Sequence, residues 1–166
     1  MKIYIMFKKK NTTMLEKLIA KWTNGPYSHV EIMIPNNNIY YMYSAVNYKE
    51  YRGVRKQKGY FNRDVFDYKE IEITKEQYLI IYSFLESILG SKYDGAGILG
   101  FILPTQDRTD RWFCSEVVSN CFKIIGEEFM WLIEPSSVSP NRLGRMLHMI
   151  ENNQPTYIER ITHLFT

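Results

Sequence analysis

Residues 111–121, RWFCSEVVSNC, predict a helix that begins at or next to a cysteine. Apolar or sulfur-bearing side chains recur at helical spacing along one face of this segment, at positions 114, 117, 118, 121, 124 and 125. Gly126 provides a natural C-terminal stop, and the polar run 104–111 before the helix is unsuited to a core. A thiol at a helix start lies near the positive end of the macrodipole and near unpaired backbone N–H groups, which favour its thiolate. Cys114 is therefore the candidate nucleophile.

The alternative interpretation is a structural cysteine. Cysteine is among the most buried residue types, and Cys114 lies on the apolar stripe. Cys121 follows seven residues later, roughly 10 Å along a helix axis, so a disulfide between the two is geometrically excluded in an intact helix. We expect Cys121 in the core. Two cysteines without a plausible pairing fit a reducing compartment.

The composition is that of an ordinary globular protein. The chain has 166 residues, of which 45% are hydrophobic and 23% charged, which excludes a disordered chain and predicts one domain over residues 1–166. A net charge of +3 is too small to indicate a nucleic-acid partner. The first apolar run is interrupted at Lys8 and is too short for a signal peptide, and the longest apolar segment, 98–103, is too short to span a bilayer. We therefore expect a cytoplasmic protein without a transmembrane segment.

The remaining elements predict an α+β fold. Residues 27–34 and 39–46 read as a hairpin around the turn 35–38, and residues 2–8 and 65–73 read as further strands. Thr13 and Thr74 each begin a capping box, and Ser139 followed by Pro140 has the pattern of an N-cap and first residue of a last helix. The helix after Thr13 is expected to place five apolar side chains on one face: Met14, Leu15, Leu18, Ile19 and Trp22. We expect an antiparallel sheet packed against helices.

His29 is the second candidate site residue. On an alternating strand His29 and Glu31 point to the same side, which brings a carboxylate near the imidazole. A half-buried histidine with satisfied hydrogen bonds is the alternative. His148 lies off the apolar stripe of the last helix and His163 lies near the end of the chain, so we expect both to be solvated. A helix-start cysteine with a strand histidine is the pairing of papain-like hydrolases, in which a third polar group holds the ring.

Several motifs together carry a family resemblance. They are residues 27–31 (YSHVE) before a tyrosine-rich strand, 92–97 (KYDGAG), 112–116 (WFCSE) and 139–141 (SPN). With these motifs, roughly residues 25–147 resemble the circularly permuted NlpC-type papain-like superfamily. That superfamily contains bacterial and viral cysteine hydrolases and is related to the lecithin–retinol acyltransferases.

The resemblance implies a permuted papain-like fold with Cys114 as nucleophile and His29 as base. The family usually takes its orienting polar residue from the strand after the histidine, where this chain offers Ser44 but no carboxylate or amide before Asn47. Glu31 is the nearest carboxylate in the sequence and the preferred third residue, with Ser44 second. Glu116 is interpreted mainly as a favourable charge in the first helical turn.

The predicted function is thiol-dependent hydrolysis or acyl transfer on a peptide, amide or lipid ester through an acyl-enzyme. No metal or organic cofactor is implied, because the Cys and His residues lack zinc-like spacing. A binding or virion-type structural module of the same fold, without turnover, is the alternative. A nucleic-acid binder using the basic, tyrosine-rich segment 40–58 is a further alternative, although a solvated hairpin edge and sheet-covering tyrosines explain that segment as well.

Overall fold

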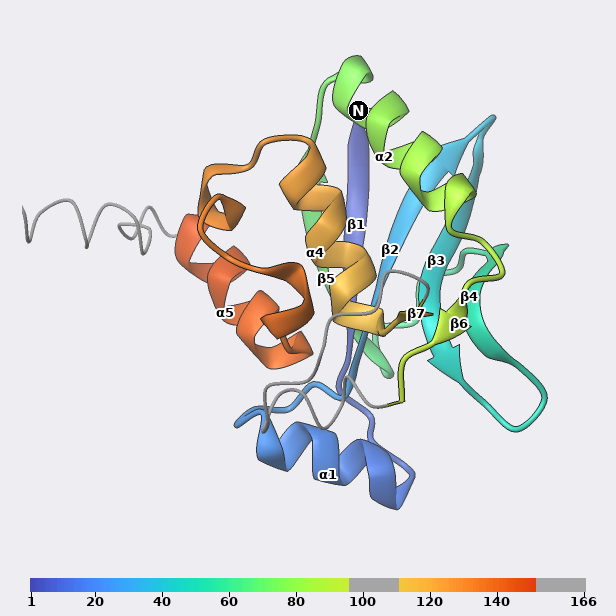
Figure 1. Ribbon diagram of the computed structural model, residues 1–166, viewed down its shortest axis with the longest axis vertical. Helices are drawn as coiled ribbons and strands as arrows, with labels where there is room; N and C mark the ends of the chain where they lie inside the picture. Colours follow the sequence, from blue (N-terminus) through green and yellow to red (C-terminus); the bar gives the residue numbers. More distant parts are fainter. Residues whose placement is uncertain (96–110, 152–166) are drawn as a thin grey trace, which may run out of the picture.

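The structure is a computed structural model that describes residues 1–95 and 111–151, the last three by their backbone alone. Its strands are β1 (Lys2–Lys8), β2 (His29–Asn36), β3 (Ile39–Asn47), β4 (Arg52–Lys58), β5 (Phe66–Glu72), β6 (Lys92–Tyr93) and β7 (Arg111–Trp112). Its α-helices are α1 (Met14–Trp22), α2 (Lys75–Ser87), α4 (Cys114–Ile124) and α5 (Pro140–Glu151), with 3-10 turns at Glu128–Met130 and Pro135–Ser137. The predicted α+β class is confirmed (Figure 1).

Five strands form one antiparallel sheet in the order β4-β3-β2-β1-β5. The first strand of the chain therefore lies inside the sheet, where Tyr4 is opposite Met33 of β2 on one side and Glu70 of β5 on the other. The predicted hairpin is β2–β3, and its turn passes through Asn37 and Asn38, which both adopt positive φ. Strands β6 and β7 form a separate parallel pair close to β4.

The two faces of the sheet are covered differently. Helices α2, α4 and α5 contribute to the main core on one face, where α4 packs against β2 and β3 through its buried apolar stripe (Figure 1). The opposite face carries a smaller cluster of Met6, Met33, Met42 and Phe66, flanked by tyrosines. The exposed ring of Phe61, in the segment between β4 and β5, stacks edge-on against Tyr4 in this second layer.

Helix α1 carries the predicted apolar side chains, but most of them lie outside the core. Only Ile19 and Ala20 are buried, whereas Met14, Leu15, Leu18 and Trp22 are exposed. The helix lies beyond the end of the sheet at which β1 ends and β2 begins (Figure 1), and the part of the chain that the structure describes buries only its Ile19 and Ala20 side. The predicted capping box at Thr13 is present, and the one at Thr74 begins α2 as expected.

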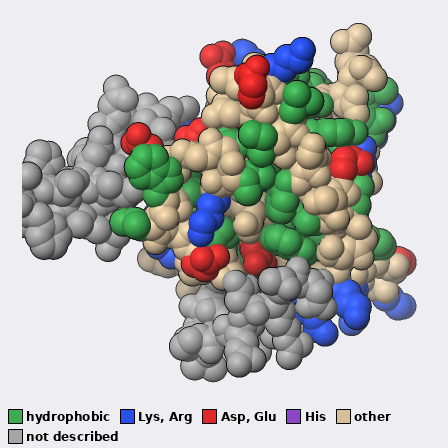
Figure 2. Space-filling view, turned by 45° about the horizontal axis from the view of Figure 1, so that its top comes forward, with side chains coloured by type: hydrophobic (Ala, Val, Ile, Leu, Met, Phe, Trp, Pro, Cys, Tyr) green, Lys and Arg blue, Asp and Glu red, His purple; other side chains and the backbone are tan. Residues whose placement is uncertain are grey.

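The surface mixes apolar and charged side chains. On the face seen in Figure 2, apolar side chains occupy the middle and charged side chains lie towards the edges. Among the described residues, no helix is both long and apolar enough to cross a membrane. The apolar segment 98–103, most of the polar run before Cys114, and His163 lie outside the described residues.

Candidate active site

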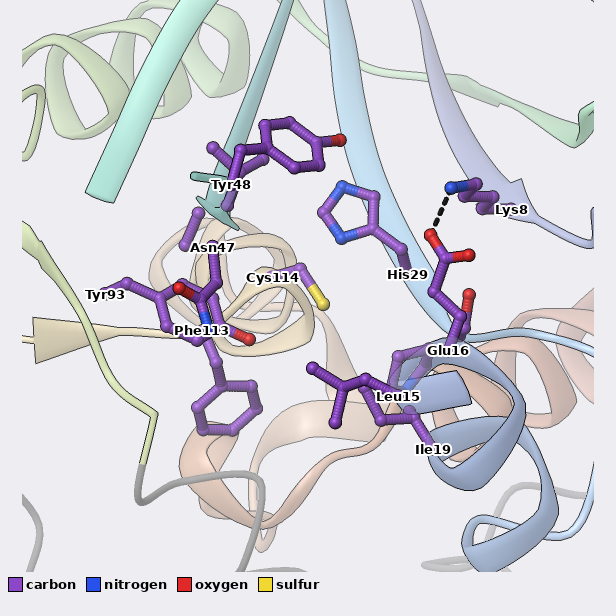
Figure 3. Close-up of a pocket in the computed structure, with 14 residues that line it drawn as sticks. Lys8, Leu15, Glu16, Ile19, His29, Asn47, Tyr48, Tyr93, Phe113 and Cys114 are labelled. Atoms are coloured by element: carbon purple, nitrogen blue, oxygen red, sulfur yellow. Dashed lines mark hydrogen bonds and ion pairs between the residues drawn. The ribbon is translucent and has the colours of Figure 1, made fainter. Parts of the chain in front are cut away.

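The candidate site lies at the end of the sheet where β2 begins, between α1 and the start of α4. A pocket of about 80 Å³ opens there, and both Cys114 and His29 line it (Figure 3). Three segments supply most of the remaining wall: Leu15, Glu16 and Ile19 of α1, Ala45 to Tyr48 at the end of β3, and Tyr93 with Phe113 beside the thiol. Residues far apart in the sequence are thus brought together by the ends of neighbouring elements.

Cys114 is the first residue of α4. Phe113 precedes the helix in an extended conformation and has no side-chain acceptor with which to cap it; instead Oε2 of Glu116 accepts a hydrogen bond from the Phe113 N–H at 3.3 Å. Glu116 is itself buried, so its carboxylate caps the N-terminus of α4 from the interior of the protein. Cys114 is only 7% exposed and lines the pocket.

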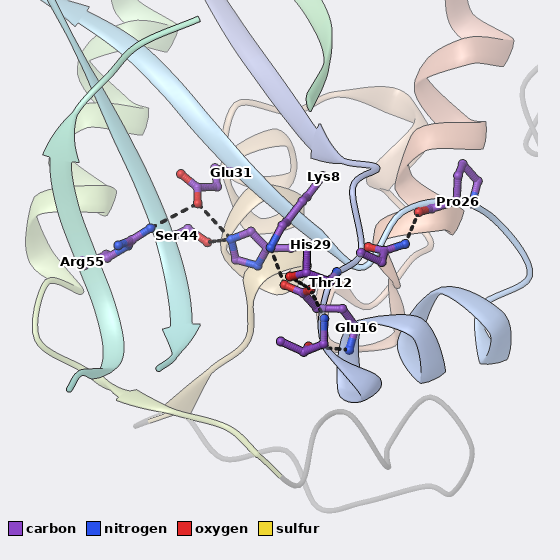
Figure 4. A network of polar contacts seen from close by, with 10 residues as sticks. Lys8, Thr12, Glu16, Pro26, His29, Glu31, Ser44 and Arg55 are labelled. Atoms are coloured by element: carbon purple, nitrogen blue, oxygen red, sulfur yellow. Dashed lines mark hydrogen bonds and ion pairs between the residues drawn. The ribbon is translucent and has the colours of Figure 1, made fainter. Parts of the chain in front are cut away.

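His29 is the first residue of β2, and both of the proposed orienting residues contact its ring. Nε2 lies 3.0 Å from Oε1 of Glu31 and 3.0 Å from Oγ of Ser44 (Figure 4). The Ser44 hydroxyl can donate to the Val30 carbonyl at 3.2 Å, which leaves its lone pairs to accept from Nε2–H. With Nε2 engaged in this way, Nδ1 is the ring nitrogen left for the thiol, which interacts with the ring through its charge and a hydrogen bond. Both side chains line the same pocket (Figure 3).

The thiol and the imidazole shift each other's pKa in opposite directions. Burial alone would lower the pKa of His29, but the charge of Cys114, hydrogen bonding to it, and Glu31 together raise it above the ordinary value. Burial alone would raise the pKa of Cys114, but the charge and hydrogen bond of His29, followed by backbone hydrogen bonds from Val30 and Ser115, lower it. The arrangement favours a thiolate–imidazolium pair.

Glu31 is a buried carboxylate that is paired on two sides. Burial raises its pKa, but the hydrogen bond and charge of His29 and the guanidinium of Arg55 outweigh burial and lower it. Nη2 of Arg55 lies 3.4 Å from the same Oε1 that contacts His29, and the guanidinium also covers the ring of Tyr48 at the pocket. The sequence favours a solvated hairpin edge for the basic part of segment 40–58, but the register places Arg55 opposite Ser44 on the face of Glu31. Only the strand pairing reveals this contact.

Tyr93 stands beside the thiol in the pocket wall. Burial, the charge of Cys114 and the charge of Asp94 all raise its pKa, so its phenol stays protonated and can donate a hydrogen bond. Tyr93 belongs to the motif at residues 92–97, whose sequence does not by itself indicate a role for the ring.

The loop that leads into His29 is fixed from across the molecule by Asn141. Its Oδ1 accepts from the Tyr27 N–H at 2.9 Å, while its Nδ2 donates to the Tyr27 carbonyl at 2.8 Å and to Oγ1 of Thr23 at 2.6 Å. A Cβ on Gly25 would lie 2.4 Å from Asn141 Oδ1, so only glycine permits this approach. Ser139 accepts from the Arg142 N–H at 3.2 Å as the N-cap of α5 and so helps to place Asn141.

The other candidate residues lie away from the pair. Cys121 is fully buried, which raises its pKa, and both cysteines are free thiols. His148 is exposed on α5. Within residues 1–95 and 111–151, no three His, Cys, Asp or Glu side chains are grouped as metal ligands. No family model matches this chain and no curated protein matches it significantly, so the functional argument rests on the geometry of these side chains.

Proposed function

We propose that this protein is a thiol-dependent hydrolase or acyltransferase with a permuted papain-like fold. The observation that carries the proposal is the position of the His29 ring, which lies between the thiol of Cys114 and the buried carboxylate of Glu31. A carboxylate behind an imidazole that faces a helix-start cysteine is the arrangement that activates a sulfur nucleophile.

In the proposed reaction the Cys114 thiolate attacks the carbonyl carbon of an amide, ester or thioester and forms a tetrahedral intermediate. The His29 imidazolium then gives its proton to the leaving group, and the carbon–leaving-group bond breaks to give an acyl-thioester on Cys114. Neutral His29 next takes a proton from water or another acceptor, which attacks the acyl carbon and releases the thiolate. Glu31 keeps Nε2–H in place throughout, so Nδ1 is the nitrogen that exchanges the proton.

The surroundings of the sulfur support charge development on the substrate oxygen. The first backbone N–H groups of α4 have no acceptor within the helix, and the helix dipole adds positive potential at the same point. The protonated phenol of Tyr93 is a further donor in the pocket wall. The pocket of about 80 Å³ opens beside the thiol, so the reacting carbonyl of a substrate can reach the sulfur there.

The experiment that tests this proposal is trapping of the acyl-enzyme with a small activated ester such as p-nitrophenyl acetate. We expect a burst of nitrophenol and an acetyl adduct on Cys114 by mass spectrometry of the intact protein and its peptides. The Cys121→Ala variant should behave like wild type, whereas Cys114→Ala should lose both signals and His29→Ala should form the adduct much more slowly. A folded protein that forms no adduct on Cys114 would contradict the proposal and favour a binding module of the same fold.

A further inference from the structure

Helix α1 exposes an apolar stripe that the rest of the described protein leaves uncovered. Met14, Leu18 and Trp22 are 81%, 37% and 50% exposed. They are four residues apart and therefore follow one side of the helix. Leu15, exposed beside them, is also part of the pocket wall, so the stripe continues into the mouth of the candidate active site.

Within residues 10–22 the exposed charge beside the stripe is positive. Lys17 and Lys21 are exposed on α1, and Lys10 is exposed just before it. The only acidic residue of α1 is Glu16, which turns away to pair with Lys8 and to accept the backbone N–H of Thr13. The exposed side of α1 therefore combines apolar side chains, a tryptophan and lysines.

We propose that α1 is a docking helix that lies on an anionic membrane surface, with Met14, Leu18 and Trp22 entering the lipid interface and the lysines contacting head groups. Amphipathic helices with tryptophan and leucine on one side and lysines beside them bind in this way. Because Leu15 belongs to both the stripe and the pocket, docking places the pocket mouth at the lipid surface. Docking does not require catalysis; only the supply of substrate to Cys114 from that surface rests on the proposed function.

The size of the stripe favours a membrane over a protein partner. A helix of nine residues is about 14 Å long, and three or four side chains on it cover much less than the about 800 Å² that each partner buries in a stable protein complex. A lipid interface needs no matching surface and accepts a few inserted side chains. The lysines would oppose the approach of a second copy of the same helix, whereas they are attracted to anionic lipid.

The test is flotation of the full chain with vesicles of phosphatidylcholine alone or with added phosphatidylserine. We expect binding to the anionic vesicles that weakens as salt is raised, and little binding to the neutral ones. Replacing Met14, Leu18 and Trp22 together with Ser should weaken binding by about tenfold or more. The matched control is Trp131→Ser with Leu132→Ser, because these side chains are 60% and 73% exposed elsewhere on the surface; this variant should bind like wild type.

Other outcomes would overturn the proposal. Wild-type protein that fails to float with anionic vesicles would do so, as would a triple variant that binds like wild type. If instead wild type forms a dimer by analytical ultracentrifugation that the triple variant does not, without vesicle binding, the stripe is a self-association surface. Two measurements on the wild-type protein separate the two proposals. Vesicle binding without acyl-enzyme formation retains docking and removes the hydrolase, and acylation without vesicle binding does the reverse.

Discussion

Two cysteines on one helix have different surroundings, and this difference predicts their reactivity. The pKa of Cys114 is lowered by His29 and by backbone hydrogen bonds, whereas burial raises the pKa of Cys121. We expect iodoacetamide to alkylate Cys114 at neutral pH at least about tenfold faster than Cys121. An ordinary thiol loses reactivity below about pH 8.5, but Cys114 should stay reactive until the pH falls through its lowered pKa.

The histidine variant is the control for this prediction. His29→Ala removes the imidazolium, so the fall in the alkylation rate of Cys114 should move to higher pH, towards that of an ordinary thiol. Peptide mapping after timed labelling measures both cysteines in one sample. Equal rates for the two cysteines in folded protein, or a pH profile that His29→Ala leaves unchanged, would contradict the thiolate–imidazolium pair.

Glu31 and Ser44 both lie 3.0 Å from Nε2 of His29, but they differ in charge. The carboxylate stabilises the imidazolium and fixes the tautomer, whereas the hydroxyl adds only a neutral contact. We expect Glu31→Gln to lower the rate of Cys114 acylation by about 10²-fold or more, and Ser44→Ala to lower it only a few-fold. The two losses of rate can be compared directly, because both substitutions change the side-chain volume little. The larger loss identifies the residue that orients the His29 ring, so a larger loss from Ser44→Ala would assign this role to β3.

Arg55 keeps the buried carboxylate of Glu31 paired, and its removal should cost stability. Because the folded pKa of Glu31 is lowered, its contribution to stability is present above the unfolded pKa of about 4.3 and is lost as the pH falls through the folded value. Arg55→Met should therefore lower the free energy of unfolding by about 1–3 kcal/mol at neutral pH. The difference from wild type should shrink in acid, as measured by urea unfolding. Arg52→Met, on an exposed position of the same strand, is the control and should have little effect.

At the scale of an element, the start of α1 depends on the charge of Glu16. Burial raises the pKa of Glu16, but the ammonium of Lys8 and the backbone N–H groups of Thr13 and Thr12 lower it to about 2. A lowered carboxyl pKa gives stability that is present above about pH 4.3 and is lost between that pH and about 2. The helix start, which borders the pocket, should thus weaken in acid.

Glu16→Gln isolates the charge, because glutamine still suits a capping box. We expect the variant to be about 1–3 kcal/mol less stable than wild type at pH 7, with a difference that disappears as the pH approaches about 2. Chemical unfolding followed by circular dichroism at several pH values measures it. Glu50→Gln, an exposed carboxylate between β3 and β4, should leave the pH dependence unchanged; the same change in both variants would rule out a specific role for Glu16.

At the scale of the whole molecule, Asn141 joins the start of α5 to the segment before His29. Asn141→Ala would leave the Tyr27 N–H and the Thr23 hydroxyl without this partner in a buried place, which should cost about 2–4 kcal/mol of unfolding free energy. Because the loop positions His29, the acylation rate of Cys114 should fall as well. Arg142→Ala, at the next and exposed residue, is the control. Unchanged stability in Asn141→Ala would show that the segment before His29 holds its position without the hydrogen bonds of Asn141.

Local elements are the part of this protein that its sequence predicts well. The capping boxes at Thr13 and Thr74, the hairpin turn at residues 35–38 and the end of α4 before Gly126 all depend on residues within a few positions of each other. Local hydrogen bonds and periodicity encode such features directly. The strand predicted over 65–73 is likewise observed at Phe66–Glu72.

Local sequence sets which residue types begin each helix and strand, whereas the packing of those elements sets which side chains come into contact. The sheet order sets β1 between β2 and β5, brings Arg55 across from Ser44 to reach Glu31, and joins Asn141 to Tyr27. The position of α1 beyond the end of the sheet (Figure 1) also leaves its apolar stripe outside the core, because the described part of the chain buries only the Ile19 and Ala20 side of the helix. Such contacts join residues distant in the chain, and a periodic pattern specifies which side of an element is apolar without specifying what will cover it.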